Sequence, residues 1–578
     1  MENQNKKGLD TDEKGFETEI KDDDKVKTPK NFKYDLEYFK KRRTQLDGIF
    51  NTIKSDLREL SEYFSPRNCR FLVSDVNKAY KKSKKIVDSV TLTAVRNFAS
   101  GMQSGATSAA TTWFKIQMKN QILNKDNEVK IWLKKQEDLQ RQILEASNFY
   151  QAMLEVYKQL AVYGFSAVVM NPDYHTVVNF QLLPIGSYRY AKDHRGNIDT
   201  FCRAYMEKAQ NLVREYGYEN CSRAVQQAYD NNDGVSLFEI VYFVEANKEY
   251  DKNSPLASKK KYISVTFECG QDEKFLRKSG FDRFPVALFE AEVNGEDEYP
   301  SNCPAIEALP DAKQLMMQVK EYAKGIKKLV SPLYKAPASL QKLKGFVDAP
   351  SAIIPEDDNG RGLSPVYEIN PRILELKQSN DELKEVIKEH FYNDLFAVIL
   401  NTAERGRTAT EVNELKEEKM VLLSPLLDQV HKGLRQIQDW VFYRTVETGI
   451  IPMPPDLVAN EDIEIIFVST LALAQKVKGI SSIERFTTFT ANLAQTFDPS
   501  LSFKVNGDRV VDIYAEIANI DPELLTPQEE VDKRRQAQAE QQAQAQQMQQ
   551  LQQGADMIKT LGGIDSSGAD LQQRLGLG

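Results

Sequence analysis

The segment SNDELKEVIKEHFYNDLFAVILN, residues 379–401, decides how the rest of the chain is interpreted. Its apolar residues recur at steps of three and four, which places them on one side of a helix. The basic stretch ERGR, residues 404–407, follows, and a second apolar stripe runs through residues 412–441. The pattern predicts two long helices, about 35 Å and about 55 Å in length, separated by a loop. The core of a small globular domain does not need helices of this length.

The composition bounds the class of the protein. A chain of 578 residues is expected to form about two to four packed units. No run of about 18 apolar residues occurs, so we expect no membrane span. The five cysteines are scattered and odd in number, which is typical of reduced thiols. The formal net charge of −8 argues against a protein that binds nucleic acid tightly, because such proteins usually carry a basic excess.

Taken in order, the chain predicts an α+β fold that is predominantly helical. Residues 1–34 are charged and poor in aromatic side chains, so we expect a disordered arm. Short, mostly antiparallel strands are expected across residues 165–295. Further helices are expected at 34–64, 126–162, 303–330, 471–497 and 508–517, and further strands at 113–119, 352–354, 366–367 and 462–467.

No group of residues predicts catalysis. The chain has four histidines, and none has the spacing of a metal site or of a nucleophile–base pair. Neither GxGxxG nor GxxxxGK[ST] occurs, so no phosphate-binding loop is expected. We therefore expect no enzyme, no metal and no cofactor.

Six segments occur in a characteristic order: GNIDTFCRAYMEKAQNLVREYG (196–217), EYPSNCPAIEALPDAKQLMMQ (298–318), RTATEVNELKEEKMVLLSPLLDQ (407–429), GIIPMPP (449–455), FVSTLALAQK (467–476) and EEVDKRR (529–535). In their order and spacing, these segments resemble the portal (head-to-tail connector) proteins of short-tailed, podovirus-type bacteriophages. The chain departs from the family pattern at residues 300–302, where glycine, arginine and a small residue are usual, and at Thr470, where proline is common.

The resemblance implies a ring of twelve subunits at one capsid vertex, through which double-stranded DNA is packaged, retained and ejected. Implied partners are the terminase, tail adaptor proteins, the major capsid protein, and scaffolding and ejection proteins. The ring is expected to assemble in the host cytoplasm and to remain in the virion. The implied parts are an N-terminal arm (1–34), a wing (35–302), a first stem helix (303–330), a clip (331–377), a second stem helix (378–400), a tunnel loop (401–409), a long wing helix (410–455), a crown (456–525) and a glutamine-rich barrel or tail (526–578).

The resemblance also implies site residues. In the tunnel loop, Arg405 and Arg407 could form sparse basic rings that guide or slow the duplex. The alternative is that these arginines begin a helix or form salt bridges between subunits. The implied channel residues are Glu404, Arg405, Gly406 and Arg407, and the implied docking residues of the clip are Tyr334, Lys335, Lys342 and Lys344.

Two other classes compete with this interpretation. A scaffold or another helical tail component would show mainly coiled-coil heptads, and the strand-rich region and the proline-bounded insert argue against it. An enzyme with an unrecognised site would need residues that the motif search does not find.

Overall fold

The computed structural model of the chain describes residues 34–73, 85–120, 122–270, 274–330, 334–335, 364–365, 373–400, 409–451, 455, 458, 463–468, 483, 485–495, 505–518, 526 and 530–545. Its helices are α1 (Leu36–Phe64), α2 (Val90–Ala106), α3 (Asn127–Ala146), α4 (Phe149–Tyr163), α5 (Ala209–Tyr216), α6 (Arg223–Asp230), α7 (Pro304–Val330), α8 (Ile373–His390), α9 (Asn393–Leu400), α10 (Ala409–Glu447) and α12 (Gly507–Ala518). Its strands are β1 (Phe114–Met118), β2 (Phe165–Asp173), β3 (Val177–Leu182), β4 (Tyr188–Lys192), β5 (Ile198–Lys208), β6 (Leu237–Ala246), β7 (Tyr262–Cys269), β8 (Phe275–Phe281), β9 (Val286–Glu290), β10 (Tyr334–Lys335), β11 (Ser364–Pro365) and β12 (Ile463–Phe467).

The described residues confirm the predicted α+β class with helices predominating. The expected helices at 34–64, 303–330 and 508–517 and the strand at 462–467 are present within a few residues. Residues 485–495 of the helix expected at 471–497 are helical, and so are residues 530–545. The strands expected at 352–354 and 366–367 lie outside the described residues.

A five-stranded antiparallel sheet, in the order β4-β5-β6-β7-β8, forms one end of the body. Helix α1 covers one face of this sheet, where Phe39 packs against Phe243 with ring centroids 5.3 Å apart. On the opposite face, Ile240 packs with residues of α5 and α6. Successive side chains of a strand point to opposite faces, so Ile240 and Phe243, which are three residues apart on β6, lie on different faces.

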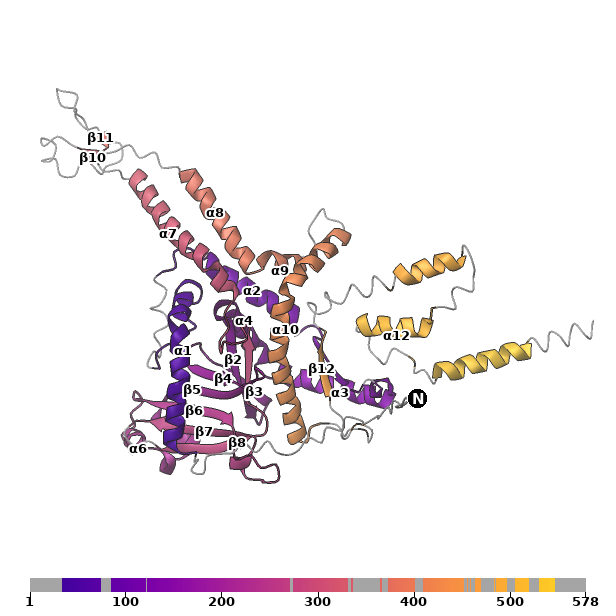
Figure 1. The fold of residues 1–578 in the computed structure, drawn as a ribbon, viewed down its shortest axis with the longest axis horizontal. Helices are drawn as coiled ribbons and strands as arrows, with labels where there is room; N and C mark the ends of the chain where they lie inside the picture. Colours follow the sequence, from indigo (N-terminus) through magenta and orange to yellow (C-terminus); the bar gives the residue numbers. More distant parts are fainter. Residues whose placement is uncertain are drawn as a thin grey trace, which may run out of the picture.

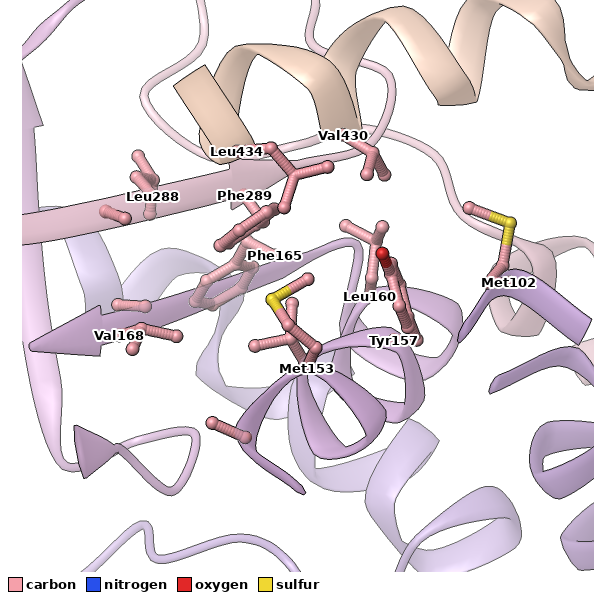
Figure 2. Close-up of a cluster of buried hydrophobic side chains, with 14 of the residues drawn as sticks. Met102, Met153, Tyr157, Leu160, Phe165, Val168, Leu288, Phe289, Val430 and Leu434 are labelled. Carbon is pink, nitrogen blue, oxygen red and sulfur yellow. The ribbon is translucent and has the colours of Figure 1, made fainter. Parts of the chain in front are cut away.

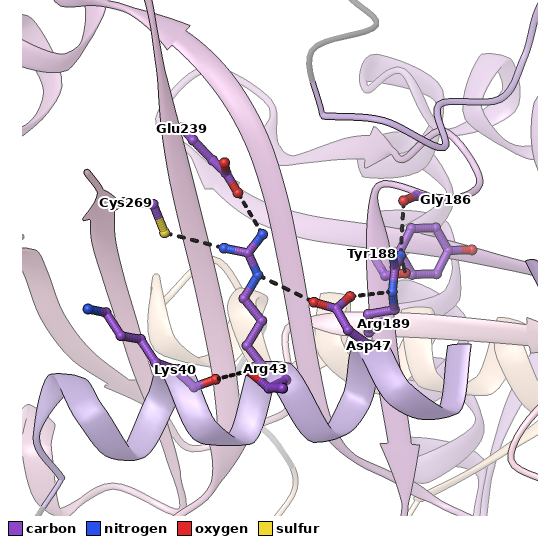
Figure 3. Close-up of polar contacts among 9 residues, drawn as sticks. Lys40, Arg43, Asp47, Gly186, Tyr188, Arg189, Glu239 and Cys269 are labelled. Carbon is purple, nitrogen blue, oxygen red and sulfur yellow. Dashed lines mark hydrogen bonds and ion pairs between the residues drawn. The ribbon is translucent and has the colours of Figure 1, made fainter. Parts of the chain in front are cut away.

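Charged side chains connect α1 to the same sheet (Figure 3). Nη2 of Arg43 lies 2.6 Å from Oε1 of Glu239 on β6, and Nη1 of Arg43 donates to Sγ of Cys269 on β7. Asp47 accepts from Arg189 on β4 at 3.0 Å. The Arg189 guanidinium also lies 3.6 Å from the ring centroid of Phe50. These contacts fix the helix across three strands, because each charge has a partner of opposite sign or an aromatic face.

A second sheet, in the order β3-β2-β9, lies in the main core (Figure 2). Phe165 of β2 and Phe289 of β9 are fully buried there, beside α4 and α10. Gly433 permits the close approach of α10, since a Cβ at this position would lie 2.5 Å from Cδ1 of Phe289. The side-chain oxygen of Gln436 on α10 accepts from the backbone N–H of Leu288 at 2.9 Å. The long helix therefore also covers the free edge of β9.

The two strands expected at 113–119 and 462–467 form a small antiparallel sheet of their own. Phe114 is opposite Phe467 and Met118 is opposite Ile463. Phe467 also stacks on the ring of His431 from α10, with centroids 4.4 Å apart. The sequence predicted each strand but not their pairing, which joins segments that are far apart in the chain.

The prediction of one helix over residues 126–162 is wrong. The chain forms α3 and α4 and breaks between them at residues 147–148. At the break, the side-chain amide of Asn148 donates to the carbonyl of Phe180 and accepts from the N–H of the same residue, at 2.8 and 2.9 Å. Asn148 thus acts as a strand partner for the edge of β3, which an interior helical residue cannot do.

Asp282 connects the last turns of α10 to the five-stranded sheet and makes stability depend on pH. Its Oδ2 accepts from Nζ of Lys260 at 2.8 Å and from the hydroxyl of Tyr443 at 3.0 Å. Burial opposes ionisation of Asp282, but these hydrogen bonds outweigh it and lower the pKa of the carboxyl. A lowered pKa stabilises the folded state above the unfolded-state pKa, and this contribution is lost as the pH falls through the folded-state pKa.

We expect Asp282→Asn to lower the free energy of unfolding by less than about 1 kcal/mol at pH 7, because the group is partly exposed. The difference in the free energy of unfolding between variant and parent chain should shrink in acid. Urea unfolding at neutral and at acidic pH measures this difference at each pH. The matched control is Asp428→Asn on the exposed side of α10, and an equal pH dependence in the two variants would contradict the prediction.

Candidate functional site: the α7–α8 helix pair

Helices α7 and α8 lie side by side and run antiparallel away from the body, with β10 and β11 at the far end (Figure 1). The base of α7 is buried through small and aliphatic residues. Further along, the same helix has few buried positions, and Met317 is 63% exposed. The end of the helix pair near the body therefore belongs to the hydrophobic core, and the far end is exposed to solvent. The buried residues at the base of α7 are Ala305, Ala308, Ala312, Leu315 and Met316.

One hydrogen bond and two ion pairs connect the two helices to each other and to the body. Nε2 of His390 on α8 lies 3.2 Å from Oδ2 of Asp311 on α7. Lys384 on α8 is 2.9 Å from Asp88, which precedes α2, and Lys313 on α7 is 2.7 Å from Glu59 on α1. These side chains are partly exposed, so each pair contributes little energy and mainly sets the angle of the helices.

The far end of the pair holds two of the predicted clip residues. Tyr334 and Lys335 form β10, and they lie opposite Pro365 and Ser364 of β11. The two ends of the insert, at residues 335 and 364, are therefore neighbours. The other predicted clip residues, Lys342 and Lys344, lie outside the described residues.

The continuous helix expected over residues 379–401 is instead two helices. The chain breaks after α8 at Tyr392, whose backbone has φ +54°. Phe391 then packs against Phe64, and Phe396 of α9 packs against Phe98 with ring centroids 5.7 Å apart. The two aromatic contacts compensate a left-handed conformation that costs about 1–2 kcal/mol in a residue other than glycine.

Gly101 of α2 makes room for α9. A Cβ on Gly101 would lie 2.2 Å from Cγ of Phe396. This close approach explains part of the small-residue character of α2. The sequence signal for it was the run of small residues in 94–106, but no pattern indicated which helix would lie against them.

The predicted channel residues follow α9. Glu404, Arg405, Gly406 and Arg407 lie outside the described residues, between the end of α9 at Leu400 and the start of α10 at Ala409. The structure thus describes the helices on both sides of the predicted loop, and the loop itself is not described.

The described residues do not form a recognisable catalytic centre. No group of three or more His, Cys, Asp or Glu side chains among them could hold a metal ion. Burial raises the pKa of the Cys202 and Cys303 thiols to about 12, so both remain protonated at neutral pH. No described helix is both long enough and apolar enough to cross a membrane.

Comparison with known proteins now shows where the chain belongs. The sequence model of the family described as "Bacteriophage head to tail connecting protein" matches residues 37–525. The chain is a member of this family. It is 33% identical over 511 residues to the portal protein of Salmonella phage epsilon15, and this alignment covers 86% of this chain and 91% of that protein. It is also 33% identical over 520 residues to the probable portal protein of Bordetella phage BPP-1, which covers 89% of this chain and 93% of that protein.

Membership in the head-to-tail connecting family confirms the predicted family, and with it the predicted portal function. The alternative of a scaffold or tail component is not favoured. Among solved structures, a chain of the virion of a native gene transfer agent particle aligns with a TM-score of 0.35 and 10% identity, covering 75% of this chain and 89% of that one. A chain from the neck of the empty particle aligns with a TM-score of 0.35 and 11% identity, covering 72% of this chain and 90% of that one.

Sequence reasoning did not identify the charge pattern on the two exposed helix sides. The exposed side of α7 carries lysines at steps of three and four, and the exposed side of α8 carries glutamates at the same steps. The spacing was visible in the sequence, but which sides are exposed depends on the body and on the partner helix.

Proposed function

We propose that the chain is one subunit of a closed ring, the portal, which forms the DNA channel at one vertex of the phage capsid. The observation that carries this proposal is the α7–α8 pair, which leaves the core of a head-to-tail connecting protein as two long antiparallel helices. Long exposed helices have no role in a monomeric globular protein. In a ring of subunits, the same helices would form the wall of a channel. Residues far apart in sequence, 304–330 and 373–390, supply one pair in every subunit.

The parts of the proposed subunit follow the helices. The stem consists of residues 303–330, which include α7, and of residues 378–400, which include most of α8 and all of α9. The clip is the insert 331–377, which ends within α8. The wing comprises 35–302 and the long helix in 410–455. Residues 401–409 form the tunnel loop, 456–525 the crown, and 526–578 a glutamine-rich barrel or tail. Twelve copies are proposed.

The proposed action on DNA is physical rather than catalytic. DNA carries about one phosphate charge per 1.7 Å of duplex axis, so a strongly basic wall would hold it in place. A chain with a net charge of −8 suits a wall along which the duplex slides. Arg405 and Arg407 would then supply sparse basic contacts in the loop. We assign the chain no enzymatic step and no cofactor.

The proposed partners act in sequence at the clip and around the ring. The packaging motor, with its terminase, docks on the clip first, and the tail adaptor proteins replace it. The major capsid, scaffolding and ejection proteins contact the ring from the capsid side. The ring would assemble in the host cytoplasm and remain at the portal vertex of the virion.

Electron microscopy of the purified full chain tests the proposal. We expect rings with a central hole wide enough for a duplex, and symmetry averaging should give about twelve copies. Rods would support a tail or scaffold component, and isolated particles at every protein concentration would contradict the portal proposal.

A further inference from the structure

The exposed side of α7 is a basic stripe. Exposed positions recur at steps of three and four, so they share one side of the helix. This side points away from Asp311 and Leu315, which face α8 and the core. The stripe consists of Ile306, Pro310, Met317, Lys320, Lys324 and Lys327. The partly buried Lys313 lies in the same line but pairs with Glu59 of α1.

The exposed side of α8 is an acidic stripe with the same spacing. It lies away from Ile387 and from His390, which contacts α7. Val386 is 39% exposed beside it, as Met317 is on α7. The stripe consists of Glu375, Gln378, Glu382, Glu385 and Glu389.

The two stripes lie on opposite edges of the helix pair, since each faces away from the neighbouring helix. Lys324 pairs with Glu321, and Glu385 pairs with Lys388, each within its own helix. One edge nevertheless has an excess of lysines, and the other an excess of glutamates. The His390–Asp311 contact fixes how the two antiparallel helices are aligned along their axes, so that positions on one helix can be matched to positions at the same height on the other. Lys324 then stands near the level of Glu375, and Lys320 near the level of Glu382.

We propose that the basic edge of one copy packs against the acidic edge of the next copy. Two copies related by a two-fold axis would bring lysine against lysine, or glutamate against glutamate. Copies related head to tail bring opposite charges together at every contact, and such contacts generate a ring when the rotation closes. Met317 and Val386 would be covered at the same contact. The inference rests on the proposed ring and names the surfaces that build it.

Nucleic acid is the other possible partner of a lysine stripe. A duplex presents only negative charge, so it would match α7 and be repelled by α8. A second copy matches both edges at once, and this favours it as the partner.

Charge reversal in the full-length chain tests the pairing. One variant, Lys320→Glu with Lys324→Glu, makes the basic edge acidic, and a second, Glu375→Lys with Glu382→Lys, makes the acidic edge basic. Each variant alone is expected to form at least tenfold fewer rings than the parent chain, as counted by electron microscopy and sedimentation. An equal mixture is expected to restore rings in which the two variants alternate, because every contact then again joins opposite charges.

The control and the contrary results separate the possibilities. Lys130→Glu with Lys135→Glu changes the same charge on exposed positions of α3 and should leave rings intact. Circular dichroism and urea midpoints like those of the parent chain show that a variant is folded. Rings in both single-edge variants, or no restoration in the mixture, would overturn the pairing while the portal proposal stands. A basic-edge variant that forms rings but no longer binds a short DNA duplex would assign the lysines to nucleic acid. Failure of the parent chain itself to form rings would instead contradict the portal proposal.

Discussion

A chain in which a short glycine–serine linker replaces residues 336–363 is expected to form normal rings that bind neither the packaging motor nor the tail adaptors. The replaced residues are the part of the proposed clip between β10 and β11. Because β10 and β11 pair, their backbones lie about 4.8 Å apart, so a short linker can join them. The deletion leaves α7, α8 and their contacts with the body unchanged.

Two measurements separate assembly from docking for this variant. Electron microscopy of the purified chain reports rings. Supplying the variant to a phage that lacks its own portal protein reports docking, and we expect heads without packaged DNA and without tails.

A linker of the same length as the replaced segment should give the same loss, which would show that sequence and not length is needed. A matched replacement of the exposed turn at residues 251–254 in the wing should package and infect normally. If the clip variant fails to form rings while the wing variant forms them, the clip assignment is wrong.

The local elements of this fold could be predicted because their periodicity is strong. The stripe in 412–441 predicted α10, and its residues Val430, Leu434 and Ile437 are fully buried. The breaks were not predictable in the same way. The apolar spacing continues through Phe391 and Leu395, and no glycine marks the left-handed residue Tyr392. Tertiary contacts of Phe391 and Phe396 decide the break, and these contacts cannot be inferred from a one-dimensional pattern.

The candidate site was predictable only in outline. The sequence indicated that two helices flank a proline-rich insert, and the structure places α7 and α8 side by side. It did not indicate that His390 would contact Asp311, because that contact depends on how far each helix extends past the body. The pairing of β1 with β12 was equally inaccessible, since it joins segments whose separation exceeds any local signal.

Lys192→Met is expected to lower the free energy of unfolding by about 3–5 kcal/mol, because it leaves a buried carboxylate without its counter-ion. Lys192 on β4 and Glu290 on β9 join the two sheets of the body. Nζ of Lys192 lies 2.7 Å from Oε1 of Glu290, and both side chains are only 9% exposed. The hydroxyl of Tyr190 donates to the same oxygen at 3.0 Å. Burial and then the charge of Glu290 raise the pKa of Tyr190, so the phenol remains a donor at neutral pH.

The double variant Lys192→Met with Glu290→Gln is expected to recover most of the loss. Glutamine removes the unpaired charge but keeps an oxygen that can accept from Tyr190. Chemical unfolding followed by fluorescence measures the change in the free energy of unfolding, at one protein concentration because ring formation would add to the apparent stability.

Lys259→Met is the matched control: its ion pair with Glu249 has the same 2.7 Å length, but the two side chains are 37% and 43% exposed. That variant should lose less than about 1 kcal/mol. An equal loss in Lys192→Met and Lys259→Met would mean that the buried pair does not hold the two sheets together.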